Sequence, residues 1–340
     1  MLNMNMSELI LLTFFTRPLK LYSVIFLVLF AGNSFAEQPS PFLSRDESPF
    51  SLIYGLPLAS SAKLLDNRQS RWISSLNISN TINLQANANE DLFIDVETWN
   101  VNFLYDYGFR ENWMLRVQLP YIVHSTGIFD SAIDAYHQAL GLPEDIRPDF
   151  PQDQVHINLN QNNETLVDIN NQQSALGDIS IQLAWQAQQS EQSAISYWLS
   201  LKLPTGDADK LTGSGAADIA AWAAINYHLN NTRWLYGQGG LLYMGDSDLF
   251  KNSQNNVAAF GNAGIKFQPW HSIELKAQLD MHSAFYDSNL EFLGPVIQIT
   301  FGGSYIINNK HKLDFAVAED IKNGASPDVN FNISWWINFL

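Results

Sequence analysis

The stretch DVNFNISWWINFL (residues 328–340) decides the fold of this chain. From Val329 to Phe339 every second residue is apolar, and the residues between them are asparagine or serine, apart from Trp336. Such alternation predicts a β-strand with one apolar and one polar face. The apolar face carries several aromatic side chains, which either a protein core or lipid has to cover.

The same alternation recurs along the chain, so the sequence predicts about twelve strands. Most are roughly 9–14 residues long, which suits a tilted transmembrane strand. They are expected at 72–85, 93–109, 112–124, 178–187, 193–204, 217–229, 233–244, 256–267, 272–283, 295–306, 311–319 and 328–340.

The connections between these strands alternate between short and long. Short ones fall at 110–111, 188–192, 230–231, 268–271 and 308–310. Long, polar ones fall at 125–177, 205–216, 245–255, 284–294 and 320–327. This pattern predicts an all-β fold, a transmembrane antiparallel up-and-down β-barrel with short periplasmic turns and long external loops.

A secreted β-sandwich or propeller is the alternative, because their strands also alternate between two faces. The distribution of aromatic residues favours the membrane. Tryptophan and tyrosine recur near strand ends, as at Trp113, Tyr121, Trp270 and Trp335, which is typical of the aromatic girdles of a barrel. Outer-membrane lipid would then cover the apolar face of 328–340.

The N-terminus has the features of an export signal. Arg17 and Lys20 precede an apolar run at 21–32, and Ser34 and Ala36 are small residues at the positions that a signal peptidase reads. We therefore expect residues 1–36 to be a signal peptide cleaved after Ala36, with a buried N-terminal helix or an uncleaved anchor as the alternative. Residues 37–71 are then a periplasmic or lumenal segment before the barrel at 72–340.

The composition of the chain limits the kinds of binding partner that it can have. The chain contains no cysteine, which excludes a disulfide framework, and its formal net charge of −16 argues against nucleic-acid binding. The strand 328–340 is the segment that we expect the barrel-assembly machinery to recognise. No cofactor is expected.

The polar face of the strands predicts the lining of the lumen. It mixes amides with charges of both signs, which fits either a narrow path for a small-molecule solute or a packed polar core. The candidate lining residues are Arg116, Gln118, Gln182, Lys202, Glu274, Lys276, Gln278 and Asp280.

The long loop 125–177 contains a candidate gate. A short helix is expected within 129–142, and a loop of this length with its own helix is usually functional. Its apolar side would be stranded in water unless it folded into the barrel mouth. The residues of that side are Phe129, Ile133, Tyr136 and Leu140.

Enzymatic chemistry is not expected. His282 and Ser283 are adjacent, but neighbours on a strand point to opposite faces, so the histidine cannot easily activate the serine. No two histidines have metal-ligand spacing on one strand face. The glycine-rich stretch LPTGDADKLTGSGAAD (203–218) lacks the pattern of a phosphate-binding loop and is expected to be a turn between two strands.

Two loop motifs carry a family resemblance. Together with the exported barrel, FDSAIDAYHQALGLPEDIRP (129–148) and LPTGD…LTGSGAAD resemble an uncharacterised family of Gram-negative outer-membrane proteins, domain-of-unknown-function family 3187. The second motif is also similar to barrels associated with uptake of phenolic and other hydrophobic compounds. The resemblance implies an outer-membrane location and brings no catalytic residues.

The leading functional hypothesis is a passive or ligand-gated route for a small solute, with hydrophobic compounds among the candidates. A structural or surface-interaction barrel without transport comes second, and a barrel-embedded lipid hydrolase third. The strand faces also predict that Leu199→Arg or Leu279→Arg impairs assembly, whereas Gln278→Arg is far milder.

Overall fold

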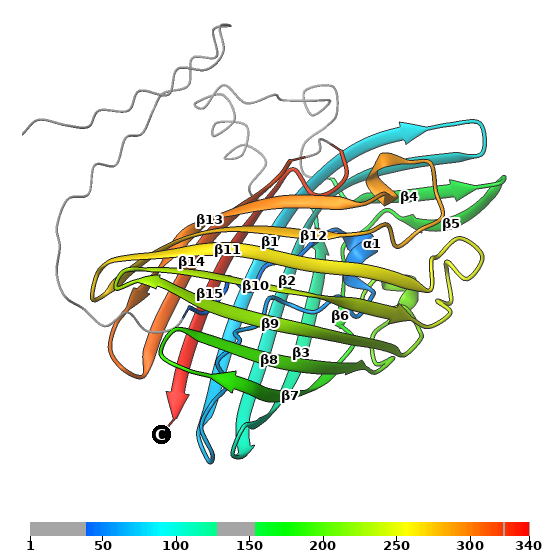
Figure 1. The fold of residues 1–340 in the computed structure, drawn as a ribbon. Helices are drawn as coiled ribbons and strands as arrows, with labels where there is room; N and C mark the ends of the chain where they lie inside the picture. Colours follow the sequence, from blue (N-terminus) through cyan, green and yellow to red (C-terminus); the bar gives the residue numbers. More distant parts are fainter. Residues whose placement is uncertain (1–38, 128–153, 322–323, 340) are drawn as a thin grey trace, which may run out of the picture.

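The computed structural model describes residues 39–127, 154–321 and 324–339. Their strands form one antiparallel sheet of fifteen, and twelve of these close into a barrel (Figure 1). Within the described residues, no helix has the length and apolar character required to cross a membrane.

The wall strands follow one another around the barrel in chain order. They are β1 (Ser70–Ala86), β2 (Glu90–Arg110), β3 (Trp113–Ser125), β7 (Ser180–Gln189), β8 (Ser193–Lys202), β9 (Asp218–Asn230), β10 (Arg233–Met244), β11 (Val257–Trp270), β12 (Ile273–His282), β13 (Val296–Ile306), β14 (His311–Asp320) and β15 (Val329–Phe339). The ring closes where β15 pairs with β1, from Ser70 opposite Phe339 to Asn80 opposite Val329. The predicted twelve-stranded, up-and-down barrel is confirmed.

The two faces of the wall differ as the alternation predicts. Large apolar side chains such as Leu199, Phe315 and Trp335 are about half exposed on the outer face, whereas Asn100 and Ser334 are fully buried inside. Trp336, which interrupts the alternation of the last strand, points inward. There its indole N–H donates to Asp314 Oδ2 at 2.9 Å. This hydrogen bond satisfies the polar atom of the ring inside the lumen.

Three further strands lie between β3 and β7, where only a helix was expected. They are β4 (His156–Gln161), β5 (Glu164–Ile169) and β6 (Gln173–Leu176). β4 pairs with Glu90–Asp95 of β2, and β6 pairs with Tyr121–His124 of β3, so both extend the wall at one end. We call this the loop end, because the long connections lie there, and the opposite end the turn end.

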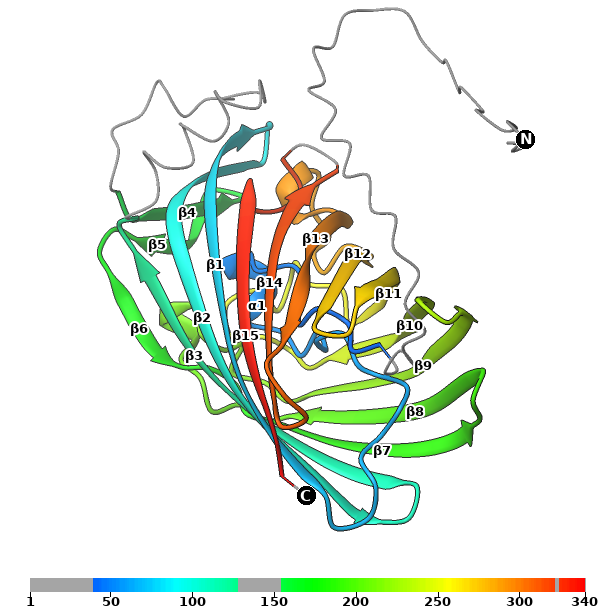
Figure 2. The same ribbon diagram turned by 90° about the vertical axis from the view of Figure 1, so that its left-hand side faces the viewer.

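The segment before β1 lies inside the barrel. Residues 39–64, here called the plug, are almost all buried, and they include the single short helix α1 (Pro49–Leu52). Figure 2 shows α1 within the ring of strands. The plug enters at the turn end, rises to α1 near the loop end and descends again to join β1. Two 3-10 helices, η2 (Ala208–Lys210) and η3 (Glu291–Leu293), lie in loop-end connections.

Candidate functional site: the plugged lumen

The rising limb of the plug runs in step with β12. The backbone N–H of Phe42 donates to Gln278 Oε1 at 3.1 Å, and the Ser44 hydroxyl donates to Asp280 Oδ2 at 2.7 Å. Further up, His282 Nε2 lies 3.2 Å from Asp46 Oδ2. Each partner is 236 residues further along the chain, because plug and strand are both extended and present every second side chain to each other.

The descending limb is held by side chains of four other strands. The backbone N–H groups of Gly55, Ser60 and Leu64 donate to Asp218 Oδ2, Gln238 Oε1 and Gln186 Oε1 at 2.8, 2.9 and 2.9 Å. Lys202 Nζ donates to the Ile53 carbonyl at 2.8 Å. The plug has no strand partner for these backbone groups, so buried amides and charges of the wall satisfy them.

An aromatic cluster closes the lumen beneath the loops. The Phe50 ring of α1 makes edge-on contacts with Phe250, Tyr286 and Phe292, at centroid distances of 5.9, 6.3 and 6.2 Å. α1 forms here because Pro49 occupies its first turn and Ser48 Oγ accepts the Ser51 N–H at 3.2 Å. Burial of Phe50 stabilises the docked plug by about 1.5–3 kcal/mol.

All eight candidate lining residues are buried inside the barrel: Arg116, Gln118, Gln182, Lys202, Glu274, Lys276, Gln278 and Asp280. Four of them contact the plug, namely Lys202, Lys276, Gln278 and Asp280. The other four bind wall residues instead, through Arg116–Asp106, Glu274–Lys266, Gln118–Asn102 and Gln182–Gln118 contacts. A role along a solute path stays a prediction for these residues.

The candidate gate residues Phe129, Ile133, Tyr136 and Leu140 lie outside the described residues.

The glycine-rich loop is organised by a buried lysine. Lys202 Nζ lies 2.6 Å from Asp178 Oδ2 and 3.0 Å from Asp218 Oδ2, and it donates to Ser214 Oγ at 2.6 Å. Asp178 also accepts the backbone N–H groups of Thr205 and Gly206 at 2.9 and 2.7 Å. The loop is therefore folded over this ion cluster, consistent with the interpretation as a turn.

Asp178, Asp218 and Asp46 were not singled out from the sequence. Asp178 lies two residues before β7, and Asp218 is the first residue of β9. A single alternation pattern does not show that their side chains converge on Lys202. Asp46 belongs to a segment without any strand pattern. The only sequence signal for Asp178 and Asp218 is that each is a charged residue at the loop end of a strand.

The His282–Ser283 pair is not arranged for catalysis. His282 Nδ1 lies 2.8 Å from the carbonyl oxygen of Ser283, while the Ser283 hydroxyl accepts the Ala259 N–H at 3.0 Å. The ring also stacks on Phe285 at 4.2 Å. Because the histidine faces Asp46 and a carbonyl, it anchors the plug. In residues 39–127, 154–321 and 324–339, no group of His, Asp or Glu side chains could hold a metal ion.

Little open space remains beside the upper plug. Two cavities there have volumes of about 20 and 10 Å³, at most the space of one water molecule. A larger cavity of about 270 Å³ opens at the turn end, between the plug and the starts of β1 and β14. The lumen is thus filled towards the loop end and open towards the turn end.

The sequence profile of the family described as "Protein of unknown function (DUF3187)" matches residues 19–339. The chain belongs to this family. The DUF3187 match spans the plug and every wall strand, so the arrangement above is that of one family unit. A search of curated proteins finds none that matches the chain.

Solved structures show the fold to which this DUF3187 protein is similar. The COG4313 outer membrane channel from Pseudomonas putida F1 aligns with a TM-score of 0.55 and 12% identity, over 82% of this chain and 98% of that one. The toluene transporter TodX of P. putida aligns with a TM-score of 0.39 and 10% identity, over 82% and 91% of the two chains. The CymD monoaromatic hydrocarbon channel aligns with a TM-score of 0.39 and 9% identity, over 81% and 89%. The first likeness shows the fold, and the other two are too weak to add to it.

Proposed function

We propose that this protein is an outer-membrane channel for a small, hydrophobic solute, and that the plug closes it in the present structure. The proposal is supported by a closed barrel with an apolar outer face, whose lumen is filled by the plug. Only non-covalent contacts hold the plug against the wall. A plug of this kind can move without breaking the wall. The similar COG4313 barrel, which is described as an outer membrane channel, points the same way.

The proposal includes an export route and a topology. Residues 1–36 would be the signal peptide, cleaved after Ala36, and strand 328–340 would bind the assembly machinery. The turn end would face the periplasm, so that the plug enters from the periplasmic side and the long loops face outward. We propose no enzymatic activity, because His282 and Ser283 are each bound to other groups.

A second candidate function is a structural barrel without transport. The density of contacts along both plug limbs favours it, because a permanently closed lumen would show the same contacts. Movement of the plug separates the two functions.

A reversible lock on the plug tests the proposal. The hydroxyl oxygens of Ser44 and Thr300 lie 3.5 Å apart, on the plug and the wall, and the chain has no native cysteine. Ser44→Cys combined with Thr300→Cys should therefore form a disulfide under oxidation. We expect planar-bilayer conductance, and toluene uptake by Gram-negative cells, to be lost on oxidation and restored on reduction. Each single cysteine variant is the control.

Two outcomes would contradict the proposal in different ways. Equal conductance in the oxidised and reduced double variant would show that the plug does not close the path. No conductance and no toluene uptake by the unmodified protein would favour the structural barrel.

A further inference from the structure

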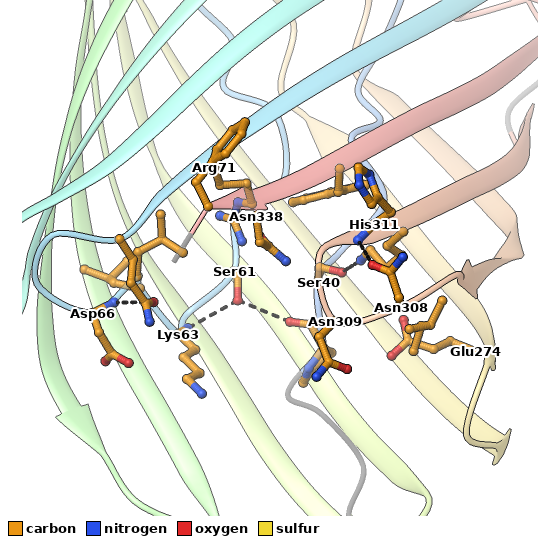
Figure 3. Close-up of a pocket in the computed structure, with 18 of the residues that line it drawn as sticks. Ser40, Ser61, Lys63, Asp66, Arg71, Glu274, Asn308, Asn309, His311 and Asn338 are labelled. Carbon is orange, nitrogen blue, oxygen red and sulfur yellow. Dashed lines mark hydrogen bonds between the residues drawn. The ribbon is translucent and has the colours of Figure 1, made fainter.

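The cavity at the turn end is large enough for a small organic molecule. Its volume is about 270 Å³, whereas an apolar cavity of about 150 Å³ already binds benzene. The two limbs of the plug form one side, and β1, β14 and β15 form the other. Figure 3 shows Lys63, Arg71 and His311 around this space. Leu64, Ile306 and Trp336 add an apolar part to its lining.

Positive charge is in excess beside this cavity. Asp106 is shared by two guanidinium groups, those of Arg71 and Arg116, each at 2.6 Å. Asp314 is likewise shared by two ammonium groups, those of Lys276 and Lys312, at 3.4 and 3.7 Å. Glu274, which also lines the cavity, is paired with Lys266 at 2.8 Å. Three carboxylates therefore face five cations here, in a protein whose formal net charge is −16. Buried charge without a counter-charge is unfavourable, so an anion bound here would stabilise the site.

Trp336 holds two of these cations at the cavity wall. The Arg71 guanidinium lies 5.0 Å from the centroid of the ring, and Lys312 Nζ lies 4.4 Å from it. Both side chains retain some exposure, 13% and 15%, and both line the cavity. The Nε and Nη2 atoms of Arg71 donate to Asp106, which leaves Nη1 without a protein acceptor among the described residues. Both cations therefore line one cavity: Arg71 keeps a donor that Asp106 does not use, and Lys312 Nζ also donates to Ser40 Oγ.

We propose that this cavity binds a small organic anion, with its carboxylate on Arg71 and Lys312 and its apolar body against Trp336, Leu64 and Ile306. A purely inorganic anion would leave the apolar lining unused, and a neutral hydrocarbon would leave the excess charge uncompensated. This inference rests on the proposed function, since such an anion would be a solute of the channel. Binding itself does not require the plug to move.

Calorimetric titration of the refolded full chain in detergent tests the site. The probes are benzoate, benzyl alcohol as its neutral counterpart, and inorganic phosphate. We expect saturable benzoate binding, with benzyl alcohol and phosphate at least about tenfold weaker. Lys312→Met should weaken benzoate binding at least about tenfold. Lys210→Met removes an exposed lysine of the loop end and should leave benzoate binding unchanged.

A second variant keeps the test informative if Lys312→Met does not fold. Asn309 is an exposed turn residue that lines the cavity, so Asn309→Trp should fill the space while keeping every cation, and should also weaken benzoate binding. Equal affinity for benzoate and benzyl alcohol, equal affinity for phosphate, or unchanged binding in these variants would overturn the inference. Benzoate binding without any transport would instead keep this site and overturn the proposed channel.

Discussion

At the scale of single residues, Lys202 links the wall, the glycine-rich loop and the plug. Its ammonium group is nearly fully buried and contacts Asp178, Asp218 and the Ile53 carbonyl. A buried cation with two carboxylates is stable only while its partners stay in place, because each buried charge is unfavourable alone. The lysine therefore makes the position of the loop depend on the position of the plug.

Lys202→Met should destabilise the protein by about 3–5 kcal/mol, because it leaves two buried carboxylates without their counter-charge. We expect a lower urea midpoint of unfolding and faster proteolysis within 203–217. Lys210→Met is the matched control, since the Lys210–Asp207 pair is about 40% exposed and such pairs contribute roughly 0–1 kcal/mol. Adding Asp218→Asn to Lys202→Met should restore part of the stability. Equal midpoints in the Lys202 and Lys210 variants would contradict this role.

At the scale of elements, the plug combines apolar anchoring at its apex with acid groups below it. Burial raises the pKa of Glu47 to about 7, although the Arg45 charge and the hydrogen bond from Asn100 Nδ2 at 2.7 Å favour its ionised form. Burial would also raise the pKa of Asp46, but the hydrogen bond and charge of His282, with Ser51 and Ser48, lower it overall. The pKa values of these two neighbouring acids are thus shifted in opposite directions.

The raised pKa of Glu47 predicts that this residue favours docking of the plug at low pH. Its pKa is about 7 when docked and 4.5 in water, so the docked state binds more protons between these values. The contribution of Glu47 to docking should be greatest below about pH 4.5 and weaken as the pH rises through about 7, by on the order of 3 kcal/mol. The lowered pKa of Asp46 has the opposite effect, at lower pH. The mobile fraction of a spin label at Ser61→Cys measures this equilibrium.

Two variants assign the pH dependence to its source. Glu47→Gln should flatten the profile between about pH 4.5 and 7, because the amide does not titrate. His282→Gln, measured in the same way, separates the contribution of the His282–Asp46 pair. A Glu47→Gln profile that matches that of the parent would show that Glu47 does not set the docking equilibrium.

At the scale of the whole molecule, the outer surface is an apolar belt. The exposed large apolar side chains come from every wall strand, and they alternate with the buried polar residues of the lumen. A soluble protein would not expose so many together. The barrel is therefore inverted relative to a soluble fold, with its polar core inside and its apolar side chains facing lipid.

A single arginine on this belt should be unfavourable to a degree that depends on depth. Leu199 is 51% exposed within β8, and Leu229 is 47% exposed next to the turn end of β9. Leu199→Arg should cost about 2–4 kcal/mol of folding free energy in lipid vesicles, and Leu229→Arg about 0–1 kcal/mol. Urea titrations of vesicle-inserted protein measure both. Equal losses at the two positions would contradict this difference in depth, and equally small ones would place Leu199 outside the hydrocarbon region.

The lumen changes one expectation drawn from the strand faces. Gln278→Arg was predicted to be mild, because Gln278 lies on the polar face. In the structure its amide binds Phe42, Ser44 and Asp280. A longer, charged side chain would disrupt these contacts, so the substitution should loosen the plug even where the barrel assembles.

The sequence by itself determined the strands, their two faces and the closure of the wall. These features follow from a period of two residues and from alternating connection lengths, both of which are local and repeated. The inward position of all eight lumen candidates follows from the same period. The short strands β4–β6 escaped prediction, because four to six residues are too few to establish a period.

Only the tertiary structure decided what fills the barrel. The plug has no periodic pattern, because wall side chains rather than a strand partner satisfy its backbone groups, and those side chains come from strands far away in the sequence. The convergence of Asp178 and Asp218 on Lys202 and the sharing of Asp106 and Asp314 between cations likewise depend on strands brought together by closure. Local pattern fixes which way a side chain points, and closure of the ring fixes what it meets.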